Sequence, residues 1–221
     1  MTTIKPTLRV SQAFTLIELL VVIAIIGLLA GMVVGLANIA GSKPKIAKTQ
    51  AELAQLVTVI EAYKAKKNYY PPDNQLIPNN PGINQLYYEL VGTTNNGTIF
   101  VTLSGKDSIS LPVTPNQPPF GVTSFNNSTK AAKGSDDFDV QNFHNGLKDA
   151  QTKVITVANG QIRVLVAPVE GPGKQQTNTW RYVSSNPTNN PGSFDLWSDI
   201  VVGGKTNRIN NWSKDPIIIG N

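Results

Sequence analysis

The chain begins with an uneven hydrophobic pattern, in which one apolar window stands out near the N-terminus. Residues Leu19–Ala37 contain 16 apolar residues, 3 glycines and no charged residue. At about 1.5 Å per residue, a helix of this length spans about 28 Å, close to the thickness of a bilayer's hydrocarbon core. The window therefore predicts a membrane-spanning helix. A secretory signal peptide usually has a shorter apolar run and a small-x-small cleavage site, so we favour it less.

An amphipathic pattern follows the apolar window. The segment Gly41-Ser42-Lys43-Pro44 predicts either a kink or the first turn of a second helical segment. Beyond it, apolar residues recur at helical spacing, namely Leu53, Leu56, Val57, Ile60 and Tyr63. We therefore expect one long helix over residues 14–67, apolar over 14–41 and amphipathic over 42–67, with its apolar face packed on a folded domain.

Residues 68–221 predict a loop-rich domain built on antiparallel strands. Gly, Pro and Asn make up 48 of these 154 residues, a density typical of many turns. The clearest strand signal is a hairpin over 154–166, where two β-branched runs flank Asn159-Gly160. Shorter strands are expected at 99–103, 180–183, 194–197 and 217–219, and a short helix or strand at 86–91. The expected fold class is α+β, a long N-terminal helix packed on a small antiparallel sheet.

Composition and charge exclude several classes of function. The 221 residues include no Cys and a single histidine, His144, which excludes disulfide scaffolds, thiolate zinc sites and a His-based metal cluster within one chain. His144 lies in a turn-like context with no nucleophile motif beside it, and Gly171–Gln175 lacks the Ser or Thr of a phosphate loop. The net charge is +5, without a basic-aromatic stripe, so no nucleic-acid partner is expected. We predict that the chain is not an enzyme.

Glu18 is the unusual residue of the N-terminal segment, because it adjoins the apolar window. A carboxylate at membrane depth costs about 2.5 kcal/mol or more and usually has a partner charge. No Lys or Arg follows it before Lys43. From the residues alone, a partner charge and a place at the headgroup boundary are both open.

The segment around Glu18, Ser11-Gln12-Ala13-Phe14-Thr15-Leu16-Ile17-Glu18-Leu19-Leu20, resembles the processing site of type IV prepilins and type II secretion pseudopilins. The resemblance implies a leader over residues 1–13, cleavage between Ala13 and Phe14, and N-methylation of Phe14. Ala13 stands where the family peptidase prefers Gly. The resemblance also implies that Glu18 pairs with the terminal amine of a neighbouring subunit, and we expect it to set the subunit register.

Gly27, Gly31 and Gly35 recur every four residues and so share one face of the predicted helix. Such spacing allows helices to approach closely in a membrane, and we assign the three glycines to assembly. The greater frequency of glycine in membrane helices explains the same spacing equally well.

Short C-terminal stretches are similar to the major pseudopilin of type II secretion. They are Tyr69–Pro72, Trp180–Tyr182, Pro191–Ser198 and Ile209–Trp212, whereas Asp73–Thr179 is unmatched and enlarged. The family's last loop usually binds calcium, which requires six to eight oxygen ligands. The corresponding loop here is residues 199–208, with Asp195, Asp199 and Asn207 as the candidate ligands. Lys205 and Arg208 in the same stretch weigh against a cation. No other cofactor is expected.

The resemblance implies a structural function. The chain is expected to be a pseudopilin, a fibre subunit of a type II secretion machinery. The family places it in the inner membrane as a single-pass protein, with its head, residues 68–221, in the periplasm. The expected partners are copies of itself, other pseudopilins, the inner-membrane assembly platform, the prepilin peptidase and methylase, and membrane lipid.

Two alternatives remain open. The first is a type IV pilin for adhesion, motility or DNA uptake, whose usual Cys-bridged loop is absent from this sequence. The second belongs to another class, a membrane-anchored binding module that does not polymerise.

Overall fold

The computed structural model describes residues 15–129, 140–158, 160–173 and 177–220, without the side chains of residues 32–41. The chain divides into two compact units, Met1–Gly41 and Ser42–Asn221. We call them the N-terminal unit and the C-terminal unit and describe each by itself.

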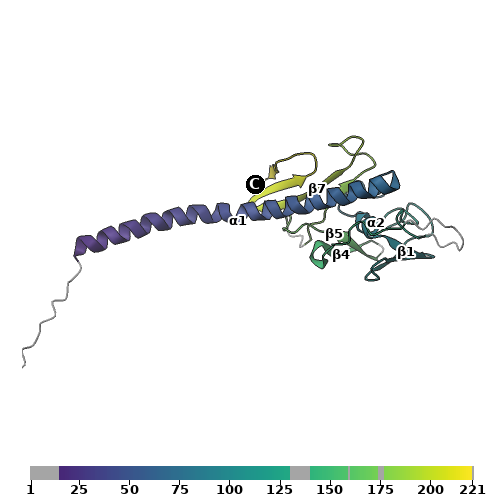
Figure 1. Cartoon of the computed structure of the whole chain (residues 1–221), viewed down its shortest axis with the longest axis horizontal. Coiled ribbons are helices and arrows are strands. Elements are labelled where there is room, and N and C mark those ends of the chain that lie inside the picture. The colour runs from purple at the N-terminus through teal and green to yellow at the C-terminus, as the bar shows by residue number, and fades with distance from the viewer. Residues whose placement is uncertain (1–14, 130–139, 159, 174–176, 221) are drawn as a thin grey trace, which may run out of the picture. The chain divides into compact units, whose positions relative to one another are not determined.

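Helix α1 runs from Leu16 to Lys67 (Figure 1). Its backbone remains helical through Gly41–Pro44, so Pro44 lies inside the helix and does not begin a new one. Three lysines, Lys64, Lys66 and Lys67, occupy the last turn, where positive charge complements the helix dipole. Asn68 ends the helix in a left-handed conformation, with a φ of 69°, and its N–H donates to the carbonyl of Lys64 over 2.8 Å. The predicted end of the helix at residue 67 is confirmed.

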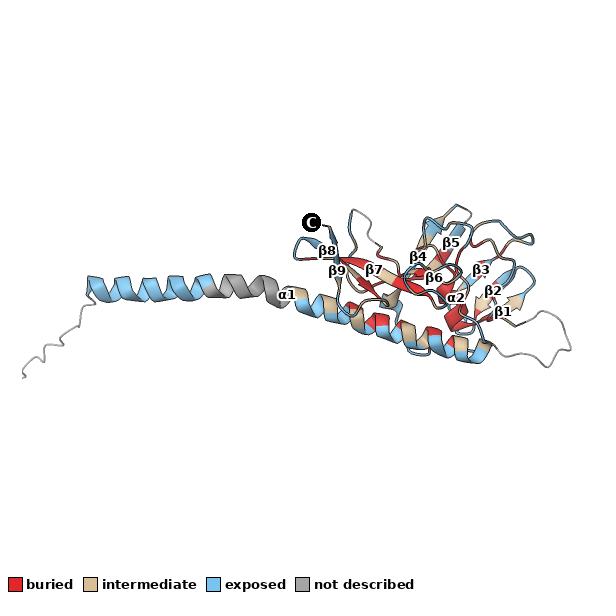
Figure 2. Cartoon of the chain, turned by 90° about the horizontal axis from the view of Figure 1, so that it is seen from above, coloured by how far each residue is buried: buried red, intermediate tan, exposed pale blue. Residues whose placement is uncertain are grey.

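The amphipathic half of α1 supplies one wall of the core of the C-terminal unit. Leu53, Leu56, Ile60 and Tyr63 are each at most 8% exposed, and Val57 is partly buried against the same core. Figure 2 shows these buried positions on the side of α1 that faces the strands. The predicted apolar stripe is therefore confirmed, and it packs as expected for a surface helix with one apolar face.

The strands form three antiparallel sheets, which confirms the α+β class. The first sheet has the order β1 (Thr93–Asn96), β2 (Ile99–Thr102), β3 (Ser108–Ser110). The second is the hairpin of β4 (Thr152–Val157) and β5 (Gly160–Leu165). The third has the order β6 (Arg181–Val183), β7 (Asp195–Val202), β8 (Lys205–Asn210), β9 (Ile217–Gly220). Helix α2 (Leu86–Val91) and a 3₁₀ turn (Asp149–Gln151) complete the elements of the described residues.

The expected strands at 99–103, 154–166, 180–183, 194–197 and 217–219 are confirmed within a few residues, and residues 86–91 form a helix. Strands β1 and β3 escaped the sequence analysis. Their sequences, Thr-Thr-Asn-Asn and Ser-Ile-Ser, carry at most one apolar side chain, so they lack the alternation that reveals a half-buried strand.

The expectation of an open loop over residues 199–208 is wrong. These residues form most of the β7–β8 hairpin, in which Val202 pairs with Lys205. The two turn residues, Gly203 and Gly204, have φ values of 60° and 77°. A tight hairpin turn of type I′ needs positive φ at both central residues, which glycine adopts at little cost. A Gly-Gly pair between two strand-like runs is itself a hairpin signal, so the sequence contained the evidence for this turn.

The enlarged region, Asp73–Thr179, packs into the same core as the rest of the C-terminal unit. Its aromatic side chains stack on one another, as Tyr88 and Phe125 do with ring centroids 5.0 Å apart. Phe100 meets Phe125 edge-on at 5.2 Å. The core cluster also includes Trp180, Phe194 and the buried face of α1. The enlarged region is therefore an integral part of this fold.

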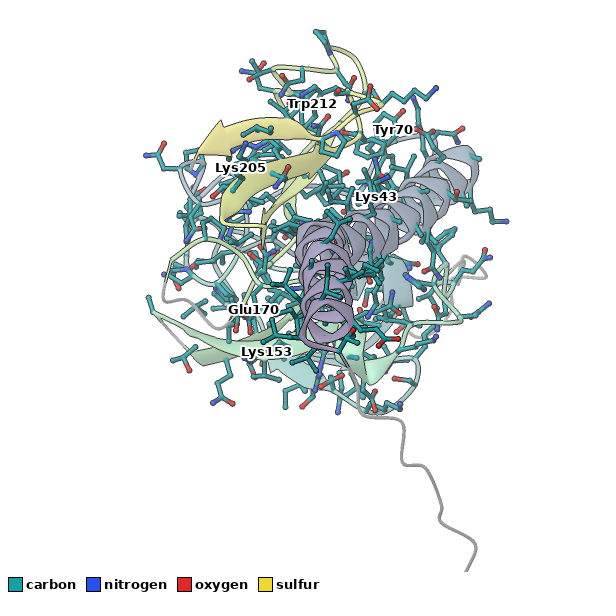
Figure 3. The ribbon with its side chains drawn as sticks, turned by 90° about the vertical axis from the view of Figure 1, so that its left-hand side faces the viewer. Lys43, Tyr70, Lys153, Glu170, Lys205 and Trp212 are labelled. Atoms are coloured by element: carbon teal, nitrogen blue, oxygen red, sulfur yellow. The ribbon has the colours of Figure 1, made fainter. Side chains whose placement is uncertain are left out.

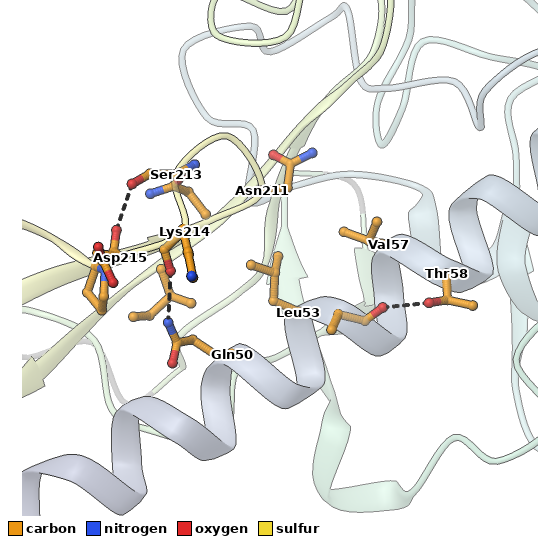
Figure 4. A pocket seen from close by; sticks show the side chains of 12 residues that line it. Gln50, Leu53, Val57, Thr58, Asn211, Ser213, Lys214 and Asp215 are labelled. Atoms are coloured by element: carbon orange, nitrogen blue, oxygen red, sulfur yellow. Dashed lines mark hydrogen bonds between the residues drawn. The ribbon is translucent and has the colours of Figure 1, made fainter.

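The segment between β8 and β9 borders a shallow groove along α1, of about 430 Å³ (Figure 4). Leu53 and Val57 of the helix and Ile209 of β8 are among the residues that line it. The side chain of Gln50 donates to the carbonyl of Lys214 over 3.3 Å. This contact links the segment between β8 and β9 to the helix.

Candidate functional site

The start of α1 holds the candidate site, and two polar side chains organise it. Thr15 precedes the first helical residue, and its hydroxyl lies 3.3 Å from the backbone N–H of Glu18, which donates to it. The carboxylate of Glu18 in turn accepts from the Thr15 backbone N–H at 3.4 Å and from the Thr15 hydroxyl at 3.2 Å. This reciprocal arrangement is a capping box, which satisfies N–H groups that the first helical turn leaves unpaired.

The capping box gives Glu18 a partner within its own chain that the sequence analysis missed. The signal was present, because Thr-x-x-Glu directly before an apolar run is the pattern of a capping box. The predicted processing residues, Ala13 and Phe14, lie outside the described residues. The structure therefore places Glu18 in the first turn of α1, at the edge of the apolar segment. Its carboxylate is hydrogen-bonded to Thr15.

The apolar side chains of the N-terminal unit are uncovered in the single chain. Eleven large apolar residues between Leu16 and Leu29 are 44% to 82% exposed. A Cβ added at Gly27 or Gly31 would meet no heavy atom within 4 Å, and the side-chain position of Gly35 lies outside the described residues. Nothing in the described part of this chain therefore requires glycine at positions 27 and 31.

The part of the chain that the structure describes contains no helix that is both long enough and apolar enough to cross a membrane.

The carboxylate of the first candidate calcium ligand, Asp195, accepts hydrogen bonds from the loop that precedes β7. The backbone N–H groups of Thr188 and Asn189 each donate to Oδ2 over 2.9 Å, and that of Asn190 donates to Oδ1 over 2.9 Å. The side-chain amide of Asn189 donates to Oδ2 as well, also over 2.9 Å. The carboxylate thus orders residues 188–190 and is 3% exposed.

The second candidate, Asp199, is paired with arginine. Arg208, its partner across the β7–β8 hairpin, donates from Nε to Oδ1 over 2.7 Å and from Nη2 to Oδ2 over 3.0 Å. Arg181 on β6 lies 3.8 Å from the same carboxylate. The third candidate, Asn207, donates its side-chain amide to the carbonyl of Lys205. The described residues include no cluster of three acidic or histidine side chains that would hold a metal ion.

Two buried carboxylates that the sequence analysis missed connect α1 to the rest of the C-terminal unit. Glu52 is 9% exposed and accepts from the indole N–H of Trp180 over 3.0 Å. Glu89 of α2 is 0% exposed and accepts from the Tyr63 hydroxyl over 2.8 Å. The backbone N–H groups of Asn126 and Asn127 also donate to Glu89, over 2.8 and 2.9 Å. A lone acid inside the apolar run Leu-Tyr-Tyr-Glu-Leu-Val was the signal available for Glu89.

Burial raises the pKa of both carboxyl groups above the usual value for Glu, because desolvation disfavours their charged forms. The hydrogen bonds from Trp180 to Glu52, and those from Asn126, Tyr63 and Asn127 to Glu89, act in the opposite direction. Burial also lowers the pKa of His144, which favours its neutral form. The hydrogen bonds of Glu52 and Glu89 connect distant segments of the C-terminal unit.

Comparison with known proteins gives one family match and one similar protein. Residues 8–34 match the family model described as the prokaryotic N-terminal methylation motif. The chain is 41% identical over 66 residues to the type II secretion system core protein G of Escherichia coli (strain K12). That match covers 29% of this chain and 44% of the relative, so the chain spans less than half of the relative's length. No solved structure matches the chain.

These matches confirm the resemblance of the chain to the type IV pilin-like proteins, and among them to the pseudopilins of type II secretion. The methylation motif contains Thr15, Glu18, Gly27 and Gly31. The capping box and the exposed apolar surface therefore lie inside the segment that carries the family signature.

Proposed function

We propose that the chain is a structural fibre subunit, a pseudopilin of a type II secretion machinery. It is stored in the inner membrane as a single-pass protein with its C-terminal unit in the periplasm, and it polymerises through the N-terminal half of α1. Its function is to bind other subunits, and it performs no bond-making chemistry. The observation that carries the proposal is the methylation motif, which coincides with an apolar helical segment that the chain leaves uncovered.

The exposed apolar side chains support this proposal on energetic grounds. Each buried Val, Leu or Ile side chain contributes about 1.5–3 kcal/mol relative to its exposed form. Eleven such side chains in one short segment are costly in water, so the segment requires lipid or other helices around it. Storage in a bilayer and assembly into a fibre supply the two environments in turn.

Processing adds the charge that assembly uses. Removal of residues 1–13 frees an ammonium group on Phe14, four residues before Glu18. In the unassembled subunit the capping box satisfies the Glu18 carboxylate. In the fibre the ammonium of a neighbouring subunit takes its place as the partner. An ion pair of this kind neutralises two charges that are each costly in an apolar environment.

The test replaces Glu18 in the full chain, with Glu18→Gln and Glu18→Ala variants. Both are expected to be processed and to abolish fibre assembly when the chain is overproduced with its secretion machinery. Glu61→Gln is the matched control, because Glu61 is exposed on the same helix far from the motif. Normal fibres from Glu18→Ala would contradict the assigned role of Glu18.

Intact-mass analysis tests the class of the protein. The mature chain is expected to begin at Phe14 and to carry one added methyl group. A mature chain that retains Met1 would contradict both fibre hypotheses, the pseudopilin and the type IV pilin, and would favour a membrane-anchored binding module. Electron microscopy of cells that produce the protein separates these two hypotheses, because long filaments on the cell surface would indicate a type IV pilus.

A further inference from the structure

The C-terminal unit carries a group of lysines at the end where its part of α1 begins. Three of them lie within six residues of each other on the helix, at positions 43, 45 and 48, and all three are exposed. Lys153 on β4 and Lys205 on β8 are exposed as well. We call these five side chains the basic end: Lys43, Lys45, Lys48, Lys153 and Lys205.

Contacts among three segments bring the basic end together. The hairpin turn before Lys205 reaches the helix, because a Cβ added at Gly203 would lie 3.5 Å from the Ser42 hydroxyl oxygen. Lys45 and Lys48 line a cavity of about 710 Å³ whose opposite wall is residues 168–171. Lys153 and residues 168–170 line a smaller cavity of about 130 Å³. Figure 3 shows Lys43, Lys153, Glu170 and Lys205 around the start of this part of α1.

The basic end has little negative charge to balance it. Glu170 is the one acidic residue that lines either cavity, and it shares these cavities with Lys45, Lys48 and Lys153. The buried carboxylate of Glu52 also attracts Lys48, so the five lysines have two acidic neighbours at most among these contacts. Within the described part of the chain, none of the five lysines forms a salt bridge, whereas Lys106, Arg163, Arg181 and Arg208 all do. A group of like charges with few acidic neighbours creates a positive potential that attracts anionic surfaces.

The position of these lysines in the sequence indicates which anionic surface they meet. Lys43 follows Ala37, the last residue of the apolar window, by six residues. Six residues span about 9 Å in a helix and at most about 21 Å when fully extended. If the window lies in a bilayer, Lys43 is within reach of the headgroup layer in either conformation. Lysine clusters next to a membrane segment attract anionic lipids, at about 1 kcal/mol per residue.

We propose that the basic end binds the phosphate groups of anionic phospholipids and so holds the C-terminal unit against the membrane surface before assembly. The proposal rests on the proposed function, because it requires the apolar segment to lie in a membrane. The cavity beside Lys45 and Lys48 accommodates a headgroup, and the ammonium groups at its edge provide charge-assisted hydrogen bonds to phosphate oxygens. Release of these contacts accompanies the departure of the subunit into the fibre.

The test uses the full chain in nanodiscs, with phosphatidylcholine alone or mixed equally with phosphatidylglycerol. The readout is hydrogen exchange of two exposed segments, residues 168–173 and 203–205. Exchange is expected to be at least about fivefold slower in the anionic discs, because one lysine contact of about 1 kcal/mol corresponds to that factor. High salt is expected to remove the difference in the unmodified chain, since screening weakens surface electrostatics.

Two triple variants provide the comparison. Replacement of Lys43, Lys45 and Lys48 by Gln is expected to abolish the slowing. The matched control replaces Lys106, Lys148 and Lys214 by Gln, which removes the same charge from exposed positions elsewhere and is expected to keep it. Equal exchange in both kinds of disc would overturn the proposal while leaving the fibre function intact. Equal slowing in both triple variants would overturn it too.

Two further outcomes are decisive. If soluble polyglutamate slows exchange in neutral discs as strongly as the anionic lipid does, the surface binds acidic protein and the lipid proposal is wrong. If the chain fails to enter the discs, the membrane segment of the proposed function is contradicted together with this inference.

Discussion

Glu89 connects three segments that are distant in the sequence. Its carboxylate accepts from the Tyr63 hydroxyl of α1 and from two backbone N–H groups of residues 126 and 127. The side-chain amide of Asn127 donates to the Glu89 backbone carbonyl over 2.7 Å. A buried carboxylate is tolerated only when its oxygens are satisfied, so each of these donors matters for stability.

Tyr63→Phe removes one of these donors. We expect it to lower the free energy of unfolding by about 1.5–3 kcal/mol, the range for hydrogen bonds to charged groups. Urea unfolding measures this change. Tyr70→Phe is the control, because the Tyr70 hydroxyl donates to the exposed Glu61 over 3.2 Å. Equal losses of unfolding free energy in the two variants would mean that the buried hydrogen bond to Glu89 contributes no more to stability than the exposed one to Glu61.

Glu52 gives a prediction for pH dependence. Burial raises its pKa in the folded chain, so the folded state binds the proton more tightly than the unfolded state does. Its contribution to stability is therefore greatest below about pH 4.5 and decreases as the pH rises through the raised folded value. Glu52→Gln keeps an acceptor for Trp180 and removes the titration. We expect this variant to lose less stability than the unmodified chain on going from pH 4.5 to pH 7.

The measurement is urea unfolding at several pH values, with Glu61→Gln as the control for the same substitution at an exposed site. Glu89 also has a raised pKa and remains in both variants, so some pH dependence persists. An unchanged pH profile in Glu52→Gln would show that this residue does not titrate differently in the folded state.

The contacts of Asp199 lead to a prediction about the effect of calcium on stability. A guanidinium group, that of Arg208, already occupies both of its oxygens, and the oxygens of Asp195 accept from residues 188–190. We therefore expect the same Tm in excess calcium and in EDTA. A site filled at a hundredfold excess over its Kd would add about 2.7 kcal/mol of stability, so a clear rise in Tm with calcium would restore the calcium prediction.

At the scale of elements, the amphipathic half of α1 is the part on which the C-terminal unit is built. Its buried stripe belongs to a core that includes strands from all three sheets as well as α2. Ile60 is 0% exposed in this stripe, whereas Gln55 lies on the solvent face of the same helix.

Ile60→Ala is expected to lower the free energy of unfolding by about 2–5 kcal/mol, because it leaves a cavity in a packed core. Gln55→Ala should change it by less than about 0.5 kcal/mol, as surface substitutions usually do. Both are measured by urea unfolding of the full chain in detergent. Comparable effects would mean that α1 does not pack on the core as described.

At the scale of the whole molecule, the two units have opposite surface properties. The N-terminal unit exposes its apolar side chains, whereas the buried residues of the described chain begin at Thr49. We therefore expect residues 42–221, expressed alone, to fold cooperatively and remain soluble without detergent. Its Tm should lie close to that of the same unit in the full chain. Calorimetry of both chains makes the comparison, and a fragment that lacks a cooperative transition would refute the independence of the C-terminal unit.

The sequence by itself determined the features that depend on neighbours along the chain. Helical periodicity from Leu53 to Tyr63 predicted the buried face of α1, and Asn159-Gly160 between two β-branched runs predicted the β4–β5 hairpin. The segment around Glu18 identified the family resemblance, because that signature is a short linear motif. Each of these signals lies within a few residues of the structure it specifies.

Tertiary structure alone decided the partners of the buried polar groups. Glu52 meets Trp180, 128 residues away, and Arg208 takes the carboxylate on which the calcium prediction depended. No local pattern specifies such pairs, because they follow from the packing of distant segments. Packing removes water from a charged group, and the group can then pair only with the polar atoms that packing brings within reach. The apolar count near the N-terminus likewise predicted a membrane segment. The folded chain then showed that its own described residues leave this segment uncovered.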